Sequence, residues 1–124
     1  MVSAVAAPPH EGPPPMRALE GIERGLWELR DRSAGRGSPP AARLCVRDPA
    51  QLIHVRHRGL RCRNFVVMDN PGRGAVTYQC EDSGTGRTDL RVETSHLVQI
   101  QTQGIADGAP FSLALEARWV GRCR

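Results

Sequence analysis

The densest group of side chains that could do chemistry is "HVRHRGLRCR", residues 54–63. It contains no acidic residue and four arginines, namely Arg56, Arg58, Arg61 and Arg63. Guanidinium groups bind phosphate and carboxylate through paired N–H donors, so the stretch is a candidate anion-binding site. The plainer interpretation is a solvated helix end and loop, because cations are favoured near a helix C-terminus.

Two other arrangements would support metal binding or catalysis. His54 and His57 would share a face of a helix and, with Cys62, could hold a metal ion. A further ligand is missing and we expect Cys62 to be oxidised, so the sequence predicts neither a metal nor another cofactor. Ser95 and His96 are neighbours in sequence, which is poor geometry for a nucleophile and its base, and no G-x-S-x-G motif is present. We therefore expect a protein that is not an enzyme.

The four cysteines favour a disulfide framework. Cys45, Cys62, Cys80 and Cys123 lack the close C-x2-4-C spacing of a structural zinc site, and an even count in a small domain predicts two disulfides in an oxidising compartment. The preferred pairs are Cys45–Cys62, closing a helical excursion, and Cys80–Cys123, tying the last strand to the sheet. The alternative is Cys62–Cys80 with Cys45–Cys123, because Cys62 and Cys80 flank one hairpin almost symmetrically.

Length and charge limit the architecture. The 124 residues suit one domain, and no apolar run approaches the roughly 18–20 residues of a membrane helix. The net charge is +4 and all 17 basic residues are arginine, a usage that a GC-rich genome explains better than anion binding does. Residues 1–20 are rich in Pro and Ala, so we expect a disordered segment followed by a single β domain over 21–124. "AVAA" before Pro8 resembles the end of a signal peptide, which favours a periplasmic or secreted location.

Alternating polar and apolar residues predict a mainly β fold. The clearest case is residues 111–120, which place Phe111, Leu113, Leu115, Ala117 and Trp119 on one face. Further strands are expected at 24–30, 44–47, 64–69, 75–81, 88–93 and 97–104. One short helix is expected at 48–55, capped by Asp48 with Pro49 in its first turn. We expect an antiparallel meander that curls into a partial barrel or half-sandwich, with Trp27 and Trp119 in its core.

Several short motifs resemble a bacterial domain-of-unknown-function family, number 3617, of small secreted or periplasmic four-cysteine proteins. They are "GLWE" (25–28), "LCVRDP" (44–49), Cys62, "TYQC" ending at residue 80, and "EARWVGRC" (116–123). The resemblance implies an exported β domain and carries over no catalytic or binding residue. "GLW" (25–27) is also similar to the start of lipocalin-like barrels, which implies a small apolar ligand unless Trp27 closes a dry core.

Together these observations predict an exported, non-enzymatic β-domain protein that binds a ligand or associates with the cell envelope. The alternative is a polyanion- or nucleic-acid-binding protein that uses the arginines of 54–63. An envelope polyanion and a small apolar molecule are the partner classes considered, and the sequence specifies no oligomeric state.

Overall fold

The computed structural model describes residues 10–11, 15–35 and 37–124, and these form one antiparallel sheet with short helical turns. The strands are β1 (His10–Glu11), β2 (Gly25–Asp31), β3 (Ala42–Val46), β4 (Cys62–Asn70), β5 (Arg73–Cys80), β6 (Thr85–Thr94), β7 (Leu97–Ala106) and β8 (Ala109–Gly121). The helical elements are α1 (Arg17–Glu20) and the 3-10 turns η1 (Pro49–Leu52) and η2 (Glu81–Ser83). The predicted mainly β fold is confirmed.

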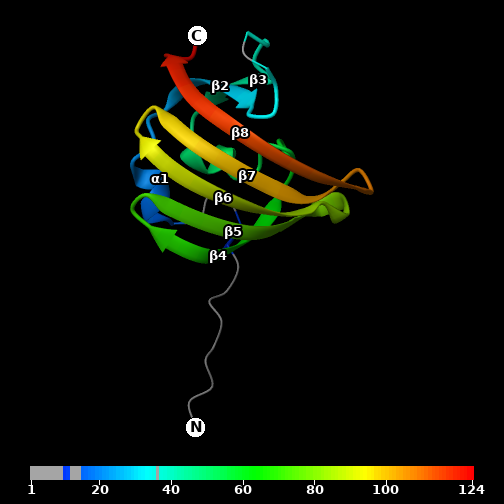
Figure 1. Ribbon diagram of the computed structural model, residues 1–124. Coiled ribbons are helices and arrows are strands. Elements are labelled where there is room, and N and C mark those ends of the chain that lie inside the picture. Colours follow the sequence, from blue (N-terminus) through cyan, green and yellow to red (C-terminus); the bar gives the residue numbers. More distant parts are fainter. Residues whose placement is uncertain (1–9, 12–14, 36) are drawn as a thin grey trace.

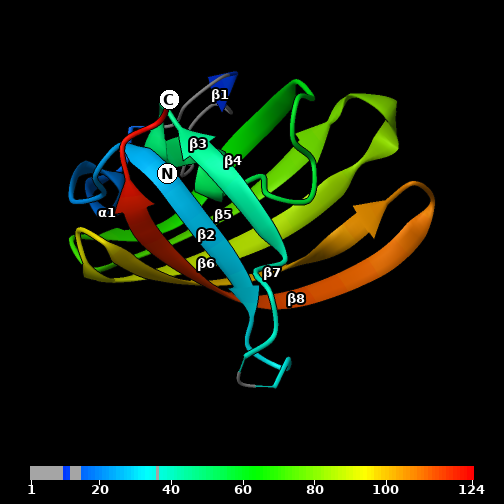
Figure 2. The same ribbon diagram turned by 90° about the horizontal axis from the view of Figure 1, so that it is seen from above.

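The strand order in the sheet is β1-β4-β5-β6-β7-β8-β2-β3, and every neighbouring pair is antiparallel. Strands β4 to β8 follow one another as the predicted meander, and β2 then pairs with the last strand, β8. Figure 1 shows these strands as a curved layer, and Figure 2 shows that the sheet curls into a partial barrel. Alternation explains the packing, because one face of each strand is turned toward the concave side.

The concave side holds the apolar core. Its fully buried side chains include Trp27 from β2, Val98 and Ile100 from β7, and Leu52 and Ile53 from the η1 region. Burial of such side chains is the main term that stabilises a domain of this size. The burial patterns along β2 and β8 confirm the alternation predicted for these two strands, and Trp27 lies in the core as expected.

Trp119 is only partly buried and packs against the edge of this core. Its indole Nε1 donates a hydrogen bond to the Arg24 carbonyl oxygen at 3.1 Å. The indole occupies the space where a Cβ at residue 25 would lie, and Gly25 has φ of +149°, so only glycine fits here. This contact gives a structural reason for the glycine in the "GLW" motif.

The described part of the N-terminal segment differs from the prediction. Residues 16–20 were expected to be disordered, but Met16, Ala18 and Leu19 are buried and α1 spans Arg17–Glu20. The Asp69 carboxylate of β4 accepts hydrogen bonds from the backbone N–H groups of Arg17 and Ala18, at 2.9 and 3.1 Å. A four-residue helix is not stable by itself, so this element depends on tertiary contacts. Residues 10–11 also differ from the prediction, because they pair with β4 as strand β1, and residues 1–9 and 12–14 lie outside the described residues.

The preferred cysteine pairing was wrong, and the alternative pairing is the one that forms. The structure contains a hairpin disulfide, Cys62–Cys80, and a terminal disulfide, Cys45–Cys123. Cys62 and Cys80 are directly opposite each other in the β4–β5 ladder. Leu26 of β2 lies opposite Cys45 on one side and opposite Gly121 of β8 on the other. The end of β8 therefore brings Cys123 to Cys45 rather than to Cys80.

Candidate binding site at the rim of the sheet

A long loop leaves η1 and crosses the concave side before it joins β4. Asp48 begins η1 with a capping box: its carboxylate accepts the Ala50 N–H at 3.0 Å, and the Gln51 side-chain oxygen accepts the Asp48 N–H at 2.9 Å. The predicted cap at Asp48 and the place of Pro49 are confirmed. The helix is a 3-10 turn that ends at Leu52 rather than continuing to residue 55, so residues 53–61 form a loop.

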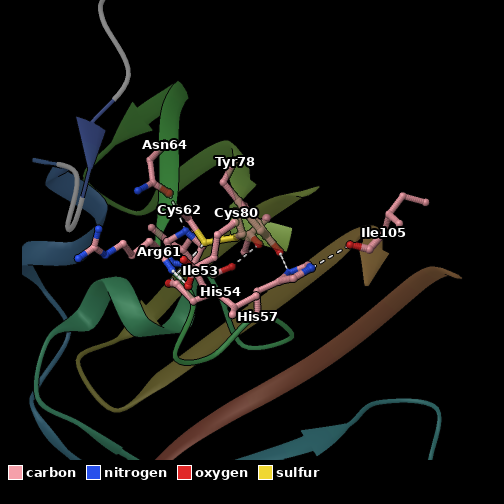
Figure 3. The surroundings of a disulfide bond; sticks show 12 residues. Ile53, His54, His57, Arg61, Cys62, Asn64, Tyr78, Cys80 and Ile105 are labelled. Carbon is pink, nitrogen blue, oxygen red and sulfur yellow. Dashed lines mark hydrogen bonds between the residues drawn. A yellow bond between two sulfur atoms is a disulfide. The ribbon is translucent and has the colours of Figure 1, made fainter. Parts of the chain in front are cut away.

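His57 anchors this loop to the sheet. The side chain is only 4% exposed, and Figure 3 shows it reaching Tyr78 and Ile105. Its Nε2 lies 2.8 Å from the Ile105 carbonyl oxygen and its Nδ1 lies 2.9 Å from the Tyr78 hydroxyl. A carbonyl only accepts, so Nε2 donates to Ile105 and Nδ1 accepts the Tyr78 hydroxyl proton. Burial raises the pKa of Tyr78, which keeps the phenol protonated as this donor.

Two more contacts hold the start of the loop. The Thr88 hydroxyl donates to the Ile53 carbonyl oxygen at 2.6 Å, on the buried face of β6. His54 Nε2 lies 2.6 Å from the Asn64 Oδ1, so the ring donates to this oxygen. Burial lowers the pKa of His54, the hydrogen bond to Asn64 opposes this, and the nearby His57 lowers it further. His54 is therefore neutral at pH 7.

A half-enclosed hollow of about 880 Å³ lies between this loop, η1 and the first residues of β4. We call it the rim hollow. Its wall includes the hairpin disulfide, the side of β3 and η1 at Leu44 and Ala50, and the loop residues 57–61. Volumes of about 300–1,000 Å³ are typical of small-molecule sites. The disulfide and the His57 anchor fix its walls, so the hollow exists before any ligand arrives.

The four predicted arginines do not act as one patch. Arg56 turns toward the β7–β8 connection, where its guanidinium lies 3.5 Å from the Asp107 carboxylate and 5.9 Å from the Phe111 ring centre. Arg58, Arg61 and Arg63 line the rim hollow instead. These three side chains are exposed, and none has an ion pair with another residue in the described part of the chain.

Two acidic residues also line the rim hollow, and both carboxylates are used by the backbone. Asp48 caps η1, and Glu81 accepts the Arg61 N–H at 3.1 Å. The Glu81 N–H in turn donates to the Arg61 carbonyl oxygen at 2.9 Å. Both acids therefore have structural partners, and the guanidinium groups of Arg58, Arg61 and Arg63 are the donors available to a ligand. Their positive charge favours an anion.

The remaining candidate residues have structural positions. Cys62 is in the hairpin disulfide and both neighbouring histidines are hydrogen-bonded, so these three residues do not form a metal site. No group of three His, Cys, Asp or Glu side chains within residues 10–11, 15–35 and 37–124 is arranged to hold a metal ion. His96 stacks on Trp119 with ring centres 4.4 Å apart and contacts Glu23, an arrangement that braces the end of β8.

Sequence reasoning found the arginines but missed what orients them. Tyr78 was expected only as part of a strand, and its bond to His57 could not be inferred from spacing because 21 residues separate them. Leu60 and the hairpin disulfide were not expected to line a hollow. The signal for this surface in the sequence was the density of arginine in residues 54–63, which contain no acidic residue.

Comparisons with known proteins add no assignment. No protein-family model, no curated protein and no solved structure matches this chain. None of the helices in the described ranges has the length and apolar character needed to cross a membrane.

Proposed function

We propose that this protein is an exported, non-enzymatic binding protein of domain-of-unknown-function family 3617, and that it takes a small anionic molecule into the rim hollow. The observation that carries the proposal is the position of Arg58 and Arg61 at a preformed hollow, without acidic partners among the described residues. A guanidinium on the ligand side of such a wall favours phosphate or carboxylate groups.

Export is supported by the two disulfides, which form and persist in oxidising compartments. The mass of the denatured protein from a periplasmic preparation tests this part. It should lie about 4 Da below the mass of the reduced chain, because each disulfide forms by loss of two hydrogens. Four free thiols in that preparation would contradict the proposed location.

The binding part is tested by calorimetric titration with phenyl phosphate at low salt. We expect binding by the wild type and a loss of at least about tenfold in affinity for R58Q/R61Q, because a hydrogen bond to a charged group contributes about 1.5–3 kcal/mol. R56Q is the matched control: it removes a charge from the same loop but leaves the rim hollow intact. Absence of phenyl phosphate binding, or an equal loss in R56Q, would contradict the proposal.

The second candidate is binding of a polyanion, which the exposure of Arg58, Arg61 and Arg63 favours. An extended polyanion responds to the net charge of the surface rather than to the shape of a hollow. R56Q and R58Q should therefore weaken polyanion binding equally, and added salt should weaken it steeply. Titration of a sulfated polysaccharide distinguishes the two. Equal losses, without any binding of phenyl phosphate, would favour this second function.

A further inference from the structure

The rim hollow has an apolar side next to its arginines. Leu60 is 37% exposed at its edge and is one of six exposed large apolar side chains in the described structure. Leu44 and Ala50, which are almost fully buried, line the same hollow, and the two cysteines of the hairpin disulfide complete this wall. A ligand that carried only charge would leave this apolar surface in water, whereas an apolar group would cover it.

The loop places the two kinds of surface close together. Gly59 has φ of +80°, a conformation that glycine adopts readily and other residues avoid. The turn at Gly59 separates Arg58 from Leu60 and Arg61, and all of these residues line the hollow. An anionic group held by the two arginines would therefore have Leu60 beside it, with Ala50 and Leu44 on the wall of the same hollow.

We propose that the ligand of the rim hollow is an anionic amphiphile, a phosphate monoester or carboxylate on a single alkyl or acyl chain. This inference rests on the proposed function and adds the class of ligand. Charge complementarity selects the headgroup at Arg58 and Arg61, and the wall formed by Leu60, Ala50 and Leu44 takes the first part of the chain. The core side chains Leu52 and Ile53 are fully buried, so the alkyl chain of the ligand lies in the rim hollow rather than inside the sheet.

The walls of the rim hollow are held in place, which favours binding of such a ligand. The His57 anchor and the hairpin disulfide hold both sides of the hollow, so little ordering of the protein is required on binding. The volume of about 880 Å³ suits one short chain.

The test is a titration with hexyl, octyl and decyl phosphate, each below its critical micelle concentration. We expect the affinity to rise about two- to fourfold with each added methylene until the hollow is filled, since transfer of an apolar group from water scales with its buried area. R58Q/R61Q should lower the affinity by a similar factor at every length and keep the dependence on length. Leu60→Ser should reduce that dependence, and R56Q should leave the series unchanged.

The outcomes separate this inference from the function on which it rests. Equal affinities for phenyl phosphate and all three alkyl phosphates would overturn the proposal that the ligand is an amphiphile, while the proposed anion-binding function would still stand. Binding of none of these probes would overturn both. Binding of octanol as tightly as octyl phosphate would show that the arginines are not used, and binding only to vesicles of phosphatidylglycerol would show that the surface recognises a membrane instead. Either result would overturn the inference.

Discussion

Tyr78→Phe removes one oxygen atom from the contact that anchors the loop of the rim hollow. The aromatic ring stays in place, and Tyr78 is only 2% exposed, so the substitution creates no large cavity. It leaves His57 Nδ1, which accepts the Tyr78 hydroxyl at 2.9 Å, without its donor. A buried acceptor that loses its partner costs about 1–3 kcal/mol. We therefore expect the free energy of unfolding to fall by that amount.

The assay is equilibrium unfolding in urea, followed by tryptophan fluorescence, with Thr77→Val as the matched control. Thr77 precedes Tyr78 on β5 and points to the other face, and its hydroxyl has no hydrogen bond within the described structure. Valine suits a strand, so the control should stay within about 0.5 kcal/mol of the wild type. Hydrogen exchange of the His57 amide, which donates to the His54 carbonyl at 2.9 Å, should also become faster in Tyr78→Phe. Equal stabilities of the two variants would refute the anchoring role.

The two disulfides, Gly84 and His54 give three further predictions. Replacing both cysteines of the hairpin disulfide with alanine should lower the free energy of unfolding by about 3 kcal/mol, and the same change at the terminal disulfide should lower it by about 4–5 kcal/mol. The difference arises because the two disulfides close loops of 18 and 78 residues. Unfolding in urea measures both costs, and a larger cost at the hairpin disulfide would contradict this order. Gly84→Ala should lower the free energy of unfolding by about 1–3 kcal/mol because its Cβ would lie 2.7 Å from His57 Cδ2. Gly21→Ala is the control and should be close to neutral, since residue 21 has open space around it. Equal melting temperatures of the two variants would contradict a steric clash with His57. Burial lowers the pKa of His54, so the contribution of His54 to stability is present above pH 6.5 and is lost as the pH falls below that value. The wild type should therefore lose more stability between pH 7.5 and pH 5 than His54→Gln does. Equal losses in the two proteins would contradict this prediction.

The sequence predicted the strands well because alternation in β7 and β8 directly reflects which side chains face the core. It predicted the cap of η1 for a local reason, since Asp48 and Gln51 are three residues apart. The fold of residues 16–20 was missed because α1 is held by Asp69, about fifty residues away. Local patterns carry no signal for such a contact.

The cysteine pairing shows the same limit. The prediction favoured Cys45–Cys62 because it closes a short loop, but pairing is decided by which strands are neighbours. Strand β2 lies between β3 and β8, and this brings Cys123 to Cys45. The arginines of the candidate site were found from composition, whereas the separation of Arg56 from Arg58 and Arg61 depends on the path of the loop.

Binding of an anion in the rim hollow is tested most directly by a titration of isotope-labelled protein with phenyl phosphate, followed through the backbone amide signals by NMR. We predict saturable shifts confined to the hollow, at Arg58, Leu60, Arg61 and the neighbouring residues 79–81. Shifts centred on other arginines, such as Arg73 on the outer face of β5, or no saturable shifts at all, would contradict the claim.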